Sequence, residues 1–102
     1  MAVGENKVEN IKKAITLIKK ATENGSKVVA LPECFNSPYG IQHFSKYAEP
    51  IPDGETSQAL SAAAKENNIF LVGGSIPESD EGKLFNTCTV WNPEGMLLCK
   101  HR

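Results

Sequence analysis

Residues 7–31 contain a helix pattern followed at once by a strand pattern, and this order restricts the folds open to the chain. Four apolar residues recur at the three- and four-residue spacing of an amphipathic helix: Val8, Ile11, Ile15 and Ile18. This spacing predicts a helix over residues 7–24, which Gly25 ends because glycine readily adopts a left-handed conformation. The apolar, β-branched run that follows predicts a buried strand over residues 28–31. A helix that returns so directly into a strand is the unit of a layered α/β fold.

The middle of the chain continues this alternation. Residues 41–47 are predicted as a short helix or a turn, and residues 49–54 as a loop, since they contain two prolines and an Asp-Gly pair. A second helix is predicted over residues 56–67, with Thr56 or Ser57 as its N-cap. Residues 69–72 are apolar without alternation, which predicts a second buried strand covered on both faces, as in a parallel or mixed sheet.

The C-terminal part of the chain is predicted to be β-rich. We interpret Gly73 and Gly74 as close backbone packing at a strand end, because no helix pattern follows them to complete a phosphate-binding loop. Residues 77–83 are predicted as a polar loop. The runs 84–91 and 96–100 flank Asn-Pro-Glu-Gly at residues 92–95, which predicts a hairpin closed by a type I turn.

Composition narrows the class of protein. A chain of 102 residues forms at most one domain, and its net charge of −1 gives no electrostatic reason to expect nucleic acid or an anionic membrane as a partner. No apolar run approaches the roughly 20 residues of a membrane span, and the N-terminus lacks a signal-peptide core. Three cysteines without close spacing indicate a reducing compartment. We therefore expect a cytoplasmic location; a mitochondrial one stays open, because an address could precede Met1.

Glu33 is the candidate functional residue, because it follows a predicted buried strand. Pro32 cannot donate a ladder hydrogen bond and ends the strand before it, so Glu33 comes just beyond a strand's carboxyl end, where open α/β sheets place their ligand crevice. A carboxylate between apolar residues there needs a structural partner or a chemical task. The alternative is a strand-end carboxylate that caps the next backbone turn.

Five stretches of the chain carry a resemblance to a known family: residues 27–40, 47–49, 72–78, 85–87 and 100–102. In order along the chain, they resemble the nitrilase (carbon–nitrogen hydrolase) superfamily, and Phe-Asn-Ser-Pro-Tyr at residues 35–39 looks most like its Nit2-type ω-amidase branch. The resemblance implies an α/β fold that is part of a four-layer αββα sandwich. Residues 1–102 would then be a partial domain, about a third of the whole, lacking most of the first strand and the C-terminal two thirds.

The same resemblance implies a Glu-Lys-Cys triad that hydrolyses a carbon–nitrogen bond through a cysteine acyl-enzyme. Glu33 matches the glutamate, the general base; the lysine and the nucleophilic cysteine of the family have no counterpart in these 102 residues. We therefore expect the chain alone to be inactive and poorly stable. Phe35 and Tyr39 are candidates for walls of the substrate pocket and are equally compatible with packing.

For the substrate, the resemblance points to 2-oxo dicarboxylic acid monoamides such as 2-oxoglutaramate and 2-oxosuccinamate, cleaved to the 2-oxo acid and ammonia. No cofactor and no metal are implied, and the expected partners are a small-molecule amide and, in the complete protein, a second copy in a homodimer. Alternatives are another nitrilase-family amidase, or a non-catalytic truncated isoform that pairs with a full-length enzyme.

The cysteines and histidines present do not supply a competing site. Cys34 sits within the ω-amidase-type motif at a position that is not the nucleophile, and Cys88 and Cys99 are interpreted as small buried residues of the hairpin. A Cys34–His43 dyad lacks any supporting geometry. Zinc bound by Cys88, Cys99 and His101 lacks a second paired ligand motif.

Overall fold

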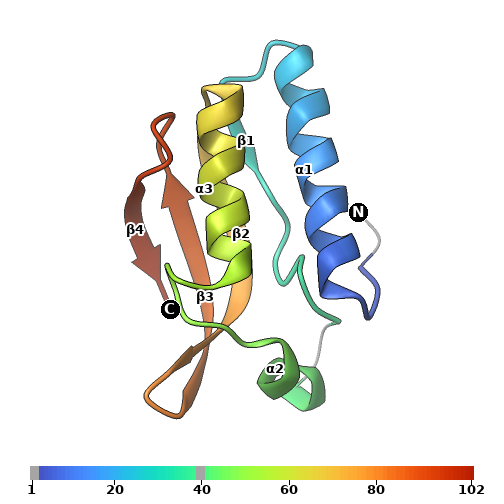
Figure 1. Cartoon of the computed structure of the whole chain (residues 1–102), viewed down its shortest axis with the longest axis vertical. Helices are drawn as coiled ribbons and strands as arrows, with labels where there is room; N and C mark the ends of the chain where they lie inside the picture. Colours follow the sequence, from blue (N-terminus) through green and yellow to red (C-terminus); the bar gives the residue numbers. More distant parts are fainter. Residues whose placement is uncertain (1–2, 39–40) are drawn as a thin grey trace.

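The computed structural model describes residues 3–38 and 41–102, in which three helices lie beside a four-stranded sheet (Figure 1). The elements, in chain order, are α1 (Lys7–Glu23), β1 (Val28–Ala30), α2 (Ile41–Tyr47), α3 (Glu55–Asn67), β2 (Phe70–Asp80), β3 (Lys83–Trp91) and β4 (Leu97–His101). The strand order is β1-β2-β3-β4, with β1 parallel to β2 and the other pairs antiparallel. The predicted α/β class and mixed sheet are confirmed.

The helices cover one face of the sheet. α1 and α3 pack against each other and in front of β1, β2 and β3 (Figure 1). The core between these layers consists of Ala14, Ile18, Leu31, Phe35, Ile51, Leu60, Ala63, Ala64, Ile69, Leu71, Ile76 and Trp91. On the other face, the paired residues Val28 and Phe70 are 64% and 46% exposed, so the predicted cover on both faces is absent within the described residues.

α1 follows the predicted pattern with two differences. Its buried side chains are Asn10, Ala14 and Ile18, whereas Val8 is 50% exposed, so the prediction that Val8 belongs to the buried stripe was wrong. The helix ends at Glu23, one residue earlier than predicted, and Gly25 follows with the expected left-handed φ of 93°. The first difference arises in the first turn of the helix, where Lys7 rather than Val8 contacts Glu55 at the N-terminus of α3.

The N-terminus of α3 is capped from a distance. The predicted N-cap by Thr56 or Ser57 was wrong: the N-cap residue is Gly54, which has no side chain to offer. Instead, Glu49 accepts hydrogen bonds from the Thr56 backbone nitrogen (2.7 Å) and the Thr56 hydroxyl (2.8 Å). Glu49 also accepts one from the Lys7 ammonium at 3.1 Å, which ties α1 to this corner. A buried carboxylate at a helix N-terminus is favoured by the helix dipole.

β2 is much longer than predicted. The interpretation of residues 77–83 as a loop was wrong, because β2 continues to Asp80 and turns into β3 through Glu81 and Gly82, both with positive φ. Pro77 is tolerated because its carbonyl, and therefore its nitrogen, points away from β3. That carbonyl accepts a bond from the Glu49 nitrogen (3.2 Å), so no ladder bond to β3 is lost.

The diglycine lies at an irregularity inside β2, between Val72 and Ser75, rather than at the end of the strand. Gly74 has a φ of 59°, and a Cβ there would stand 2.1 Å from the Pro32 carbonyl oxygen. The predicted close backbone packing is therefore confirmed, and it brings β2 against the chain that leaves β1. The predicted hairpin is also confirmed, with the Gly95 nitrogen donating to the Asn92 carbonyl at 2.9 Å.

Candidate active site

Glu33 lies where the sequence predicts it, directly beyond the carboxyl end of β1. The Leu31 nitrogen still donates to the Val72 carbonyl (2.9 Å), which holds the chain on β2 until the strand ends. The Glu33 side chain is exposed, and one of its oxygens, Oε1, accepts a hydrogen bond from Asn86 Nδ2 on β3 at 2.9 Å. The alternative of a backbone-capping carboxylate is thus not what the side chain does here.

The next residue, Cys34, fixes the loop beneath Glu33. Its φ is 50°, its side chain is 2% exposed, and its backbone nitrogen donates to Ser75 Oγ at 3.1 Å. Burial raises the pKa of the Cys34 thiol; the hydrogen bond with Ser75 opposes this rise and the neighbouring Glu33 charge adds to it. A buried thiol that keeps its proton is a poor nucleophile. This agrees with the expectation that Cys34 is not the catalytic cysteine.

The two pocket candidates have different outcomes. The Phe35 side chain is fully buried in the hydrophobic core, which is the packing role that the sequence left open. Tyr39 lies outside the described residues. Between them, Asn36 anchors the loop: its Nδ2 donates to Thr56 Oγ1 (3.0 Å), and its carbonyl accepts from Asn10 Nδ2 (3.2 Å). The loop that carries Glu33 is therefore held by both α1 and α3.

A second carboxylate, Glu78, is buried on the face of the β2–β3 ladder opposite to the one that carries Asn86. It accepts hydrogen bonds from Thr87 Oγ1 (2.8 Å), Lys100 Nζ (2.6 Å) and Arg102 Nε (2.9 Å). Burial alone would raise its pKa, but the bonds from Arg102, Lys100 and Thr87 outweigh burial and lower the pKa to about 2. The Arg102 guanidinium also lies over the Phe85 ring, 3.9 Å from its centroid. Glu78 therefore anchors the end of β4 to β2.

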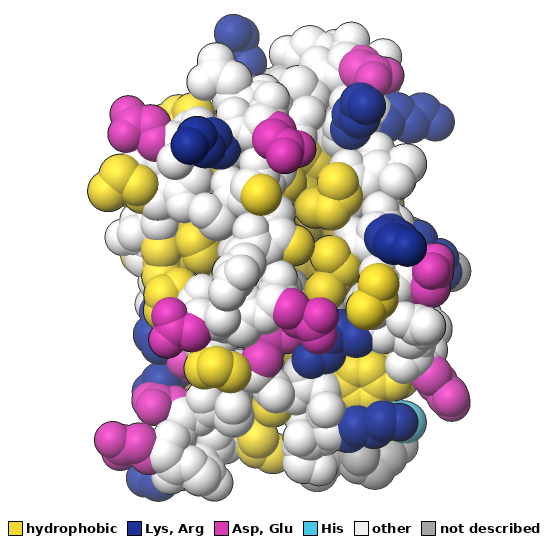
Figure 2. Space-filling view, in the orientation of Figure 1, with side chains coloured by type: hydrophobic (Ala, Val, Ile, Leu, Met, Phe, Trp, Pro, Cys, Tyr) yellow, Lys and Arg dark blue, Asp and Glu magenta, His cyan; other side chains and the backbone are white. Residues whose placement is uncertain are grey.

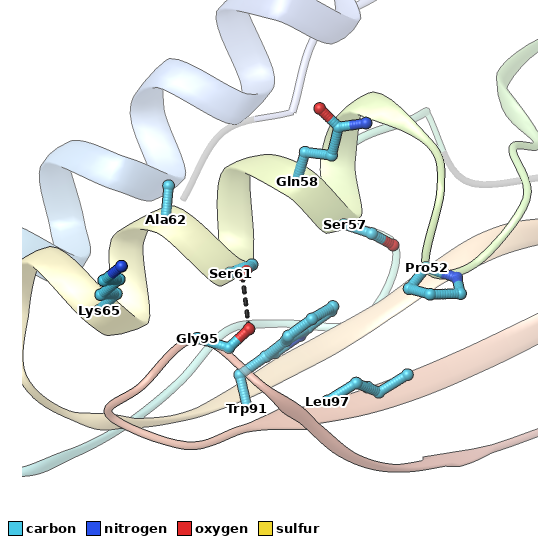
Figure 3. A pocket seen from close by; sticks show the side chains of 9 residues that line it. All are labelled: Pro52, Ser57, Gln58, Ser61, Ala62, Lys65, Trp91, Gly95 and Leu97. Carbon is cyan, nitrogen blue, oxygen red and sulfur yellow. Dashed lines mark hydrogen bonds between the residues drawn. The ribbon is translucent and has the colours of Figure 1, made fainter.

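A cavity of about 430 Å³ lies between α3 and the β3–β4 hairpin (Figure 3). Its residues are Pro52, Ser57, Gln58, Ser61, Ala62, Lys65, Trp91, Gly95 and Leu97. Figure 3 shows Ser61 reaching across to the Gly95 carbonyl, which accepts its hydroxyl at 2.5 Å. The residues around this cavity come from other elements than the loop that carries Glu33, so it is not a pocket for chemistry at Glu33.

The described residues contain no group of three or more metal-binding side chains and no helix long and apolar enough to cross a membrane. Cys34, Cys88 and Cys99 are all free thiols; of the two predicted as buried residues of the hairpin, Cys88 is partly buried and Cys99 is exposed. Figure 2 shows cationic and anionic side chains interspersed over the helical face, without a broad patch of one sign on that side. This distribution fits the small net charge.

The chain belongs to the carbon–nitrogen hydrolase family: the family model "Carbon-nitrogen hydrolase" matches residues 3–102. Among solved structures, Nit3 of Saccharomyces cerevisiae, a member of branch 10 of the nitrilase superfamily, superposes with a TM-score of 0.91 at 41% identity. That match covers 99% of this chain and 40% of the yeast chain. The CN-hydrolase superfamily protein XC1258 of Xanthomonas campestris superposes with a TM-score of 0.82 at 25% identity, over 94% of this chain and 35% of its own.

More particularly, the chain is similar to proteins named omega-amidase NIT2. The protein of Xenopus tropicalis is 59% identical over 94% of this chain, and that of Mus musculus is 54% identical over the whole of it. These matches span only 34% and 37% of the two relatives, so the chain corresponds to about a third of their length. The recognised resemblance to the ω-amidase branch is confirmed.

No local pattern in the sequence predicted the contacts of Ser75 with Cys34 or of Asn86 with Glu33. Asn86 belongs to the Phe-Asn-Thr stretch and Ser75 follows the diglycine, so both lie in segments that carry the resemblance. These contacts form only because β2 and β3 lie beside the loop that follows β1. Asn86 and Glu33 are 53 residues apart, beyond the reach of any local pattern.

Proposed function

We propose that this chain supplies the general base of an amidase resembling ω-amidase, which cleaves the terminal amide of a 2-oxo dicarboxylic acid monoamide. The observation that carries the proposal is the place of Glu33, exposed beyond β1, in a chain 54–59% identical to omega-amidases of frog and mouse. 2-Oxoglutaramate and 2-oxosuccinamate are the proposed substrates. The products are the 2-oxo acid and ammonia.

The chemistry assigned to Glu33 is proton transfer. As a carboxylate, it takes the proton of the nucleophilic thiol, and the thiolate forms a carbon–sulfur bond with the amide carbon. The proton then passes to the departing nitrogen, so the carbon–nitrogen bond breaks and ammonia leaves behind a thioester. Glu33 next takes a proton from water, whose oxygen attacks the thioester; the carbon–sulfur bond breaks, the acid leaves, and the proton passes from Glu33 to the sulfur. The resemblance assigns neither the lysine of the triad, which would stabilise the oxyanion, nor the nucleophilic cysteine to a residue of this chain.

The test joins residues 1–102 to the remaining two thirds of the Xenopus tropicalis relative, which supplies the missing groups. We expect this chimera to release ammonia from 2-oxoglutaramate, and the 102-residue chain alone to release none. Glu33→Gln keeps the shape but cannot accept a proton, so it should lower kcat by about 10²- to 10⁴-fold. Glu81→Gln, an exposed change in the β2–β3 turn, is the matched control. Near-normal turnover by Glu33→Gln would show that Glu33 has only a structural role.

A second candidate function is a non-catalytic partner that pairs with a full-length enzyme. It is favoured by the exposed apolar side chains of Val28 and Phe70 on the bare sheet face. Mixing the chain with a full-length relative should then change the activity or the size of the relative, measured by ammonia release and light scattering. Unchanged activity and size would exclude this role.

Three further properties are proposed from the resemblance. The complete protein is expected to be a homodimer, to act in glutamine and asparagine metabolism, and to reside in the cytoplasm, with a mitochondrial location left open. Light scattering of the chimera, amide levels in cells that lack the protein, and cell fractionation test these proposals in turn.

A further inference from the structure

We propose that Asn86 is the positioning residue for the base: its side-chain amide holds Glu33 by one oxygen and leaves the other oxygen for proton transfer. This inference rests on the proposed function, because it assigns a role relative to Glu33 as the base. It adds a residue of β3 to the machinery of the reaction.

The first support is the placement of Asn86 by the sheet. Asn86 lies opposite Pro77 in the β2–β3 ladder, whereas its neighbour Thr87 lies opposite Ile76 and faces Glu78. Successive side chains of a strand point to opposite faces, so Asn86 faces away from the Glu78 cluster. On that face it meets the loop after β1, where its Nδ2 donates to Glu33 Oε1 at 2.9 Å.

The second support is that both ends of the Asn86 amide have partners. Its Oδ1 lies 3.8 Å from Cys34 Sγ, within hydrogen-bond distance for sulfur. Since burial keeps the Cys34 thiol protonated, the thiol donates and the amide oxygen accepts. The amide is thereby oriented with its oxygen toward Cys34 and its nitrogen toward Glu33. A reversed amide would place its oxygen against the carboxylate and lose the bond to Glu33.

The third support is that Cys34 is itself fixed. Its backbone nitrogen donates to Ser75 Oγ on β2 (3.1 Å), at the irregularity where Gly74 lets β2 approach Pro32. Ser75, Cys34, Asn86 and Glu33 therefore form a continuous chain of contacts from β2 through β3 to the carboxylate. A base that is held in one orientation loses less entropy when it reaches the geometry for proton transfer.

The consequence for the carboxylate concerns both geometry and charge. With Oε1 engaged by Asn86, Oε2 is the oxygen left to accept the proton. A hydrogen bond donated to a carboxylate favours its charged form, which is the form that acts as the base. Among the described residues, Glu33 makes no ion pair, and its charge acts on the neighbouring Cys34 thiol, whose pKa it raises.

The test uses the chimera with Asn86→Ala and Asn86→Asp. Asn86→Ala should lower kcat by about tenfold or more with little change in KM, because the base has lost the donor that orients it. Asn86→Asp should lower kcat further, since it places a like charge beside Glu33. Cys88→Ala, on the same face of β3, is the control and should leave kcat and KM unchanged.

Two measurements separate this inference from the proposed function. In a cycle of single and double variants, Asn86→Ala should add little to the loss caused by Glu33→Gln, because both act on one step. Independently of turnover, the Tm of Asn86→Ala should stay close to that of the parent, because Asn86 is exposed and its loss leaves the core intact. Full additivity in the cycle, or a fall in kcat accompanied only by a lower Tm, would overturn the positioning role. Full activity of Glu33→Gln would instead overturn the proposed function.

Discussion

Replacing Glu78 by glutamine removes the carboxylate that holds the end of β4 while leaving a side chain of the same size. Glu78 is 1% exposed and accepts bonds from Thr87, Lys100 and Arg102. Glutamine retains one acceptor oxygen but presents an amide NH₂ to the two cations. We therefore expect the variant to fold with a loosened β4 and a reduced free energy of unfolding.

The magnitude follows from the pKa of Glu78, which is lowered from its ordinary 4.5 to about 2. At about 1.4 kcal/mol per pKa unit, this corresponds to about 3 kcal/mol. The side chains of Lys100 and Arg102 are 34% and 36% exposed, so water screens their part, and we take about 2 kcal/mol. Because the folded-state pKa is lowered, the contribution is complete above about pH 5 and is lost as the pH falls from 4.5 towards 2.

The assay is urea unfolding of the parent chain and Glu78→Gln in a stabilising osmolyte, followed by the fluorescence of Trp91, the single tryptophan. The difference in unfolding free energy should be about 2 kcal/mol at pH 7 and about half of that at pH 3. Glu81→Gln should match the parent at both pH values. A Glu78→Gln difference that is the same at pH 7 and pH 3 would refute the assignment of this stability to the carboxylate charge.

Three further changes test the packing that supports the site. Gly74→Ala should lower the free energy of unfolding by more than about 3 kcal/mol, because its Cβ would stand 2.1 Å from a backbone oxygen. Gly82→Ala is the control: its φ is also positive but its Cβ would meet open space, so it should cost only about 1 to 2 kcal/mol. Leu60→Ala should cost about 2 to 5 kcal/mol in a urea titration, against less than about 1 kcal/mol for Leu17→Ala, which is 43% exposed. Glu49→Ala removes the cap of α3 and should lower the free energy of unfolding by about 1 to 2 kcal/mol, and the Tm with it; an unchanged Tm would contradict the capping role.

Periodicity predicted the existence of most elements, because the helix and strand patterns are local properties of the chain. α1 and α3 begin and end within one residue of the predicted ranges, and the β3–β4 hairpin lies where its turn signal placed it. The position of Glu33 at a strand end followed from Pro32 and the apolar run before it. These features depend on neighbours in the sequence.

What the sequence did not show depends on neighbours in space. Pro77 looked like a loop residue, because whether a proline interrupts a sheet depends on which side of the strand its nitrogen faces. The cap of α3 comes from Glu49, seven residues before the Thr56 nitrogen that it accepts from. The partner of Glu33 is Asn86 on β3, and no sequence pattern predicts that β3 lies beside the loop of Glu33. The burial of Phe35 likewise requires knowledge of the layers that enclose the loop.

The separation between Glu33 and Asn86 sets an order in which the chain can assemble. The β2–β3 and β3–β4 hairpins close through short turns, whereas β1 reaches β2 only after the intervening residues, including α2 and α3, have been placed. Local contacts form quickly, and closure of long loops is slow and costly in entropy. An early folding intermediate should therefore contain the hairpins but no oriented Glu33. The candidate base is the part of this chain that completes last, and mild denaturant should release it first.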